Sequence, residues 1–430
     1  MINRNYLFLI LILIIGILGC TKEQDVLTFA VGGAPNEVEY WEKLIKKFED
    51  SSNIKVKIIR QPTDTDQRRQ GLVIPLKAKE KDPDVFLMDV IWVSQFAASD
   101  WLLSLNPFLE TSDLDLNSFF SGIIQQVDMY RQTLVAFPVY NDCGLLYYRK
   151  DLLQKHKFSV PETWQKLSEM ATKIQNKERE QNPQFFGFLW QGAQYEGLVC
   201  TFLEFAASNR GGFVDDAGKI KVDNIKNIEA LQFMIDMIHN YKISPPNTFT
   251  EMKEEEVRIS FENGNALFER NWPYAWGLHK RDESQIKEKV GISILPKFPE
   301  GTNAATLGGW HIGISKFSDQ KDKAWKLVEY ILSYETQKRL ALDLGWNPGR
   351  SDIYNDTEVI EKMPHIETIK KAFENAVARP NLPYYTQASE VIQRYLNAAL
   401  SGKLKPEEAL IQSQKEIEKV VEIYHDPNRY

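Results

Sequence analysis

Carboxylates and an aromatic side chain cluster where the sequence predicts that strands end. Glu37, Asp89 and Asp142 each follow a short apolar run, and Tyr140 precedes Asp142 by two residues. Carboxylates bind hydroxyl groups through charge-assisted hydrogen bonds, and the C–H face of a pyranose ring packs on an aromatic plane. This combination predicts recognition of a saccharide. Glu37 could instead only favour a helix N-terminus, and Asp89 could cap the next helix.

Two tryptophans and an arginine extend this pattern in the second half of the chain. Trp272 lies in the string RNWPYAW, Trp310 follows a pair of glycines that ends at Gly309, and Arg379 precedes a proline. Because glycine has no side chain, the backbone at Gly309 could approach a ligand closely. The ordinary alternatives are that Trp272 packs beside the following proline, that Trp310 is core, and that Arg379 forms a surface ion pair.

The elements that must position these residues alternate between strands and helices. The segments 26–31, 55–59 and 84–88 are predicted to be strands, with helical periodicity after each of the first two. The third segment is apolar through its middle, which is typical of a parallel strand buried on both faces. Such α/β sheets bind ligands beyond the carboxyl ends of their strands. Asn36 is expected to cap the first helix, with Glu39 completing a capping box.

The start of the chain has the features of an export signal. Arg4 precedes an almost unbroken apolar run over 6–15, which is too short for an ordinary membrane-spanning helix. A small residue and then Cys20 follow, as in bacterial lipoprotein signals. The sequence therefore predicts that 1–19 are removed, that Cys20 carries acyl chains, and that 20–25 link the anchor to the fold. An uncleaved anchor and a plain secretory signal are the alternatives.

Composition argues against several other functions. A net charge of −7 without a basic block is unfavourable for a nucleic-acid binder. The six histidines lack metal-site spacing and no nucleotide-binding glycine motif occurs, so we expect no cofactor. Cys143 and Cys200 are expected to be buried free thiols, with a disulfide as the alternative. No stretch after Cys20 is long and apolar enough to span a bilayer, which predicts that the rest of the chain lies outside the membrane.

Longer strings carry a family resemblance over the whole chain beyond the signal. They are VGGAPNE (31–37), TDTDQRR (63–69), PDVFLMD (83–89), GLLYYRKDLL (144–153), RNWPYAWGLH (270–279), LGGWHIGIS (307–315) and LGWNPGR (344–350). In these strings the chain resembles the extracellular solute-binding proteins of ABC importers, and within them the group that binds trehalose and maltose. The resemblance implies an α/β fold of the periplasmic-binding-protein kind, type II-like, with a ligand cleft between two lobes joined by three hinge crossings.

The resemblance also implies where the lobes divide and what individual residues do. The crossings would lie near 137–140, 292–295 and 346–350, giving an N-lobe of 26–138 plus 294–347 and a C-lobe of 139–293 plus 348–430. The implied ligand contacts are hydroxyl-binding groups of the N-lobe (Glu37, Arg68 and Asp89), two residues beside the first crossing (Tyr140 and Asp142), a stacking ring (Trp272), a backbone and ring contact (Gly309 and Trp310) and a C-terminal contact (Arg379). Adjacency leaves Arg69 as an alternative to Arg68.

These observations predict a binding protein rather than an enzyme. We expect a monomer, held outside the cytoplasm by the lipid on Cys20, that captures a disaccharide or oligosaccharide by hinge closure and delivers it to the permease subunits of an ABC importer. A sensor subunit and a secreted glycoside hydrolase are the competing interpretations. Trehalose, maltose, sucrose and longer glucans are the alternative ligands.

Overall fold

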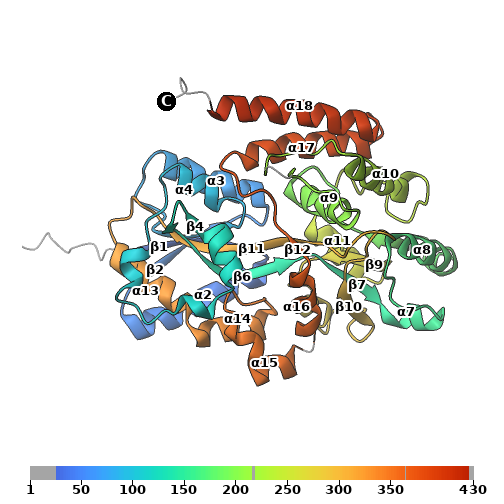
Figure 1. The fold of residues 1–430 in the computed structure, drawn as a ribbon. Helices are drawn as coiled ribbons and strands as arrows, with labels where there is room; N and C mark the ends of the chain where they lie inside the picture. Colours follow the sequence, from blue (N-terminus) through green and yellow to red (C-terminus); the bar gives the residue numbers. More distant parts are fainter. Residues whose placement is uncertain (1–25, 216–217, 364, 426–430) are drawn as a thin grey trace, which may run out of the picture.

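The computed structural model describes residues 26–215, 218–363 and 365–425, so the predicted signal segment and Cys20 lie outside the described residues. Within them, a six-stranded sheet has the order β12-β11-β3-β1-β2, with β6 also paired to β11, and a four-stranded sheet has the order β10-β7-β9-β8 (Figure 1). The strands are β1 Leu27–Gly32, β2 Val56–Gln61, β3 Val85–Asp89, β4 Met129–Tyr130, β5 Thr133–Leu134, β6 Phe137–Cys143, β7 Leu145–Arg149, β8 Phe186–Leu189, β9 Ala266–Asn271, β10 Val290–Ile294, β11 Ala305–Ile314 and β12 Ala376–Val377.

Helices cover both sheets. The α-helices are α2 Pro35–Ser52, α3 Thr65–Lys77, α4 Val93–Ala98, α5 Asn106–Leu109, α6 Ser121–Ile123, α7 Lys150–Lys155, α8 Trp164–Glu178, α9 Glu196–Ser208, α10 Ile225–His239, α11 Glu254–Glu262, α12 Ala275–His279, α13 Lys321–Leu332, α14 Tyr334–Leu344, α15 Thr357–Lys362, α16 Ile366–Glu374, α17 Tyr385–Leu400 and α18 Pro406–His425. Short turns of other helix types are η1 Leu116–Ser118, η2 Ile124–Asp128 and η3 Asp352–Asn355. None of the helices in the described part of the chain is long and apolar enough to cross a membrane.

The central strands β1 and β3 of the six-stranded sheet are buried along their whole length, as their apolar runs predict. β1 pairs in parallel with both β2 and β3. Alternate side chains of a strand point to opposite faces, so Phe29 of β1 packs with α2 and α13 while its neighbour Ala30 packs with α3 and α4. We call this sheet, with α2, α3, α4, α13 and α14, the first lobe.

The four-stranded sheet organises the larger apolar core. β7 pairs antiparallel with β9 and β10, whereas β8 pairs in parallel with β9. Apolar residues of α8, α9, α10, α11, α17 and α18 pack with this sheet in one cluster. In Figure 1, α17 and α18 lie side by side along the top, above α9 and α10. We call this sheet and these helices the second lobe.

The described chain passes between the two sheets at Gly144 and again between β10 and β11. β6 stays paired with β11 up to Cys143, and β7 of the other sheet begins after Gly144. The chain returns between Ile294, the end of β10, and Ala305, the start of β11. Because β6 runs unbroken across the predicted boundary between 138 and 139, we propose that the lobes divide at Gly144 instead.

The first helix starts earlier than the capping pattern predicts. Its N-cap is Ala34, and the carboxylate of Glu37 accepts a hydrogen bond from the Ala34 backbone N–H at 2.8 Å. The prediction that Asn36 caps this helix and that Glu39 completes the box was therefore wrong by two residues. The cause is Pro35, whose restricted φ suits the first helical position. The shift matters because it directs Glu37 toward the region described next.

Candidate ligand-binding site

Strand β11 brings three of the predicted residues into one row. Trp310 pairs with Asp89 of β3 on one side and with Tyr140 of β6 on the other. The register against β6 shifts just after Trp310, and Gly309 before it has φ of +134°. A Cβ on Gly309 would lie 2.5 Å from the Tyr140 carbonyl oxygen, so only glycine allows this close approach of β11 to β6.

One cavity between the lobes collects every ligand contact that the sequence predicts. Its first-lobe wall includes Glu37, Arg68, Asp89 and Trp310, and Trp272 lies on the opposite wall. The complete lining is Gly33, Ala34, Glu37, Thr63, Thr65, Arg68, Asp89, Tyr140, Asp142, Glu196, Gly197, Cys200, Glu254, Glu255, Trp272, Tyr274, Gly308, Gly309, Trp310, Trp346 and Arg379. Convergence of residues from both lobes on a single concave space is the usual form of a small-molecule site.

Arg68 rather than Arg69 faces the cavity. The guanidinium carbon of Arg68 lies 4.3 Å from the centre of the Trp310 ring, and its Nε donates to the Pro62 carbonyl oxygen at 2.6 Å. Burial lowers the pKa of Arg68. Arg69 instead forms an ion pair with Glu390 at 3.2 Å. Arg68 therefore presents a stacked, oriented guanidinium to the cavity.

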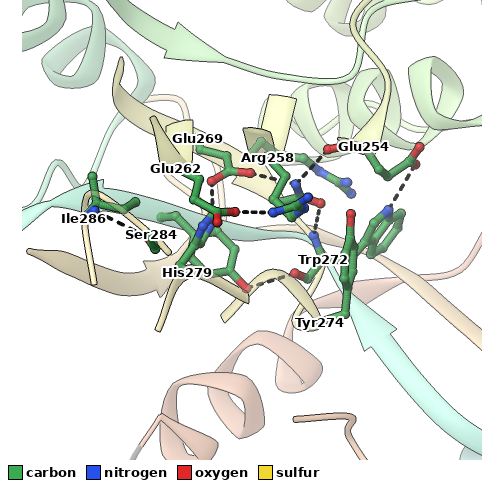
Figure 2. A network of polar contacts seen from close by, with 12 residues as sticks. Glu254, Arg258, Glu262, Glu269, Trp272, Tyr274, His279, Ser284 and Ile286 are labelled. Carbon is green, nitrogen blue, oxygen red and sulfur yellow. Dashed lines mark hydrogen bonds and ion pairs between the residues drawn. The ribbon is translucent and has the colours of Figure 1, made fainter. Parts of the chain in front are cut away.

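Trp272 is held from several directions while it lines the cavity. Its indole N–H donates to Glu254 Oε1 at 3.3 Å, as Figure 2 shows, and its backbone N–H donates to Asn271 Oδ1 at 2.8 Å. The Tyr147 hydroxyl donates to the Trp272 carbonyl oxygen at 2.8 Å. The guanidinium carbon of Arg270 lies 4.0 Å from the centre of its ring. Trp272 therefore packs against protein and, half-buried, also lines the cavity.

Carboxylates outnumber cations around the cavity. Six carboxylates line it against the guanidiniums of Arg68 and Arg379. Burial, and repulsion from Glu37 and Asp89, raise the pKa of Asp142 to about 8. Burial also raises the pKa of Glu37, although Arg68 opposes the shift. The site therefore offers many hydrogen-bond acceptors and, at neutral pH, a carboxyl that can donate.

Arg379 joins the two lobes at the back of the cavity. It donates to Glu196 Oε1 at 2.9 Å, to the Leu307 carbonyl oxygen at 3.3 Å and to Asp89 Oδ1 at 3.4 Å. Only 5% of its surface is exposed, so the alternative of a surface ion pair was wrong. Asp89 also accepts from the Ile91 backbone N–H at 3.1 Å, which means that it both ends its strand and lines the cavity.

Comparisons with known proteins agree with this geometry. The family model for bacterial extracellular solute-binding proteins matches residues 34–338. The chain belongs to this family. A Deinococcus radiodurans protein described as a probable ABC transporter-binding protein is 35% identical over 89% of this chain and 91% of its own length. Proteins of the family are binding components of ABC transporters and are not enzymes, as the sequence predicted.

Solved structures of solute-binding proteins share the two-lobed α/β fold, which confirms the predicted fold class. Maltose-bound MalE3 of T. maritima is 41% identical, with a TM-score of 0.86, and the match covers 92% of this chain and 99% of that one. A solute-binding protein of Thermotoga lettingae bound with α-D-tagatose is 27% identical, with a TM-score of 0.83 and the same coverage.

Several lining residues of this solute-binding protein were not predicted. Trp346 and Tyr274 lie inside strings that carry the family resemblance, but nothing in their spacing indicated a site. Trp346 donates to Glu37 Oε1 at 3.1 Å and packs on the Tyr140 ring with 4.0 Å between ring centres. Glu196 opens α9, and a charge at that position is usually explained by the helix dipole alone.

The two cysteines do not pair. Cys143 and Cys200 are free and buried, which confirms the expected state. Burial is the main cause that raises the pKa of both thiols. Although Cys200 lines the cavity, its thiol stays neutral and is a poor nucleophile.

Proposed function

We propose that this solute-binding protein captures a disaccharide or short oligosaccharide, such as maltose or trehalose, and delivers it to the permease subunits of an ABC importer. It acts as a monomer. The sugar binds in the cavity between the lobes, and contacts from both walls favour the closed arrangement over an open one. The permease then recognises the closed, loaded shape.

The observation that carries this proposal is the composition of the two walls. Half-buried indoles reach the cavity from each side, Trp310 from the first lobe and Trp272 from the second. Glu37, Asp89 and Asp142 supply acceptors for hydroxyl groups at the same place. Indole planes beside carboxylates match a sugar, which has apolar C–H faces and a rim of hydroxyl groups. The bound maltose and tagatose of the two solved relatives are saccharides as well.

We also propose that the protein is a lipoprotein held outside the cytoplasm. Its support is the sequence alone: a short apolar run ends at a small residue and Cys20, and polar residues follow. Two or more acyl chains on this cysteine would retain the protein at the membrane surface. Residue Leu27 begins β1 only a few residues later, so the binding domain would sit close to the anchor and to the permease.

Calorimetric titration with maltose tests the binding site through Trp272. We expect the Trp272→Ala variant to lose about 2–4 kcal/mol of binding free energy, because a buried aromatic anchor is a typical hot spot. Trp276→Ala is the matched control: Trp276 lies in the same string but packs against His365, with 4.8 Å between ring centres, and does not line the cavity.

Two results would contradict the proposal in different ways. Equal maltose affinities of the Trp272→Ala variant and the unaltered protein would show that the cavity is not where the sugar binds. A melting temperature that does not rise with maltose, trehalose or any of a panel of longer glucans would count against a saccharide ligand altogether, since a ligand of the folded state stabilises it.

A further inference from the structure

A buried ion pair lies directly behind Trp272, the indole that lines the cavity from the second lobe. Arg270, the residue of β9 two positions before Trp272, is fully buried. Its guanidinium donates two hydrogen bonds to the carboxylate of Glu204 of α9, one of 2.8 Å from Nε and one of 2.5 Å from Nη2. Its Nη1 donates to Gln191 at 3.3 Å. A planar guanidinium held at three nitrogens cannot rotate, so it forms a rigid support for a ring stacked on it.

The ring stacked on this support is that of Trp272. The guanidinium carbon of Arg270 lies 4.0 Å from the ring centre. The opposite edge of the indole reaches the first lobe, because a Cβ added to Gly308 of β11 would lie 3.1 Å from Trp272 Cζ3. The orientation of Trp272 is therefore set by Arg270 on one side, and its edge contacts the facing lobe.

The same ion pair contacts two places where the described chain passes between the sheets. At Gly144, between β6 and β7, a Cβ would lie 1.9 Å from Glu204 Oε1 and 2.8 Å from Arg270 Nη2. At the start of β11, the Thr306 backbone N–H donates to Glu204 Oε1 at 3.2 Å. Thr306 Oγ1 also donates to the Cys200 carbonyl oxygen of α9 at 2.8 Å. A rotation of one lobe against the other must therefore change the surroundings of Glu204.

We propose that Arg270 and Glu204 are positioning residues that couple the orientation of Trp272 to the two chain crossings at Gly144 and Thr306. This inference rests on the proposed function, in which Trp272 stacks on a sugar. A ligand that packs against Trp272 meets an indole whose position is fixed by the immobile guanidinium of Arg270. Glu204 contacts this guanidinium and both crossings, so the position of the indole and the arrangement of the crossings are coupled. The pair thus favours the closed lobes when a sugar packs against Trp272, in addition to any contribution it makes to the stability of the fold.

The test separates this positioning role from simple stabilisation of the fold. Breaking a buried ion pair by removing one partner destabilises a protein strongly, whereas replacing both partners is often neutral. We therefore compare Arg270→Lys with the double variant Glu204→Gln/Arg270→Met. Maltose affinity is measured by calorimetric titration, melting temperature by scanning calorimetry, and lobe closure by the maltose-induced decrease in radius of gyration in X-ray scattering.

If Arg270 and Glu204 couple Trp272 to the crossings, the variants should change maltose affinity without a matching change in melting temperature. We expect Arg270→Lys to weaken maltose binding about tenfold, since lysine keeps the charge and loses the fork and the stacked plane. In the double variant the melting temperature should return close to that of the unaltered protein, while affinity and closure stay reduced. Arg149→Met/Asp151→Asn is the matched control: Arg149 also forms a two-bond fork, in the same lobe, but away from the cavity. This control should bind maltose normally.

Recovery of affinity together with melting temperature in the double variant would overturn the inference and leave the pair a structural one. If the double variant does not fold, the maltose affinity of the Gln191→Leu variant provides the test instead. This substitution removes one support of Arg270 and should weaken binding about two- to threefold, and unchanged affinity would overturn the coupling. Absence of any saccharide binding by the unaltered protein would instead overturn the proposed function, and this inference with it.

Discussion

At the scale of single residues, the carboxyl of Asp142 has the most unusual electrostatic surroundings in the cavity. Among the described residues no side chain or backbone N–H donates a hydrogen bond to its carboxyl, and the carboxylates of Glu37 and Asp89 lie near it. Arg270 is the cation that partly offsets them. An acid in such surroundings keeps its proton to a higher pH than usual. Its protonated form could donate to a sugar oxygen while its neighbours accept.

This environment predicts how stability depends on pH. The folded protein has a pKa of about 8 at Asp142, against an ordinary value of 3.8. Between these values the folded state holds a proton that the unfolded state has lost, so rising pH destabilises the fold until about pH 8 and has no further effect above it. The contribution is at most about 1.4 kcal/mol per pH unit. Asp142→Asn removes it, so the variant should gain melting temperature relative to the unaltered protein between pH 5 and 8.

Melting curves of both proteins from pH 5 to 9 provide the check. The expected difference between them grows with pH and then becomes constant. Asp282→Asn is a suitable control, because Asp282 is exposed and its ion pair with Lys287 lowers its pKa rather than raising it. If the curves for Asp142→Asn and the unaltered protein run parallel over the whole range, Asp142 does not hold a proton in the folded state.

At the scale of elements, the sequence predicted the first lobe best where its strands are short and apolar. β1, β2 and β3 form close to the expected positions. β1 and β3 are buried along their whole length, as their apolar runs predicted, whereas β2 at the edge of the sheet is only partly buried. The ends of these strands placed Glu37 and Asp89 correctly on the cavity, which requires only that parallel strands end at one edge. The helix start beside Glu37 was wrong, because the fixed φ of Pro35 outweighs the capping pattern.

Contacts made across the cleft could not be predicted in the same way. Glu196, Glu254 and Glu255 line the cavity from the first turns of α9 and α11. In sequence these glutamates look like ordinary partners of a helix dipole. Only the packing of α9 and α11 against their sheet brings them opposite the first lobe, and that packing depends on residues distant in the chain. The register shift beside Trp310 was hidden for the same reason, since it depends on which strands flank β11.

At the scale of the whole molecule, ion pairs join the two lobes beside the cavity. Lys253 Nζ lies 2.6 Å from Asp64 Oδ2, and Arg69 lies 3.2 Å from Glu390. Asp64 is the N-cap of α3, which carries Arg68, and Lys253 is the N-cap of α11, which begins with cavity-lining glutamates. In the proposed hinge closure, each pair would form only when the lobes are close and would stabilise the closed state alone.

Removing one of these pairs should speed ligand release. Lys253 is 40% exposed and Asp64 22% at the side chain, and pairs of this kind contribute about 0.2–1 kcal/mol. We expect Lys253→Gln to raise the dissociation rate of maltose by about 1.5- to 5-fold, with little change in the association rate, because the open state that sugar enters lacks the pair. Stopped-flow fluorescence measures both rates.

A double-mutant cycle with Asp64→Asn decides whether the effect belongs to the pair. Asparagine can still accept the Gln67 backbone N–H that Asp64 accepts at 3.0 Å, so the helix keeps its cap while the charge is lost. The two substitutions together should then raise the dissociation rate no more than either alone, and high salt should bring the unaltered protein toward the variants. Arg394→Gln breaks an exposed pair with Glu416 inside the second lobe and should leave release unchanged. Additive effects of Lys253→Gln and Asp64→Asn would show that these residues act separately and that closure does not depend on their contact.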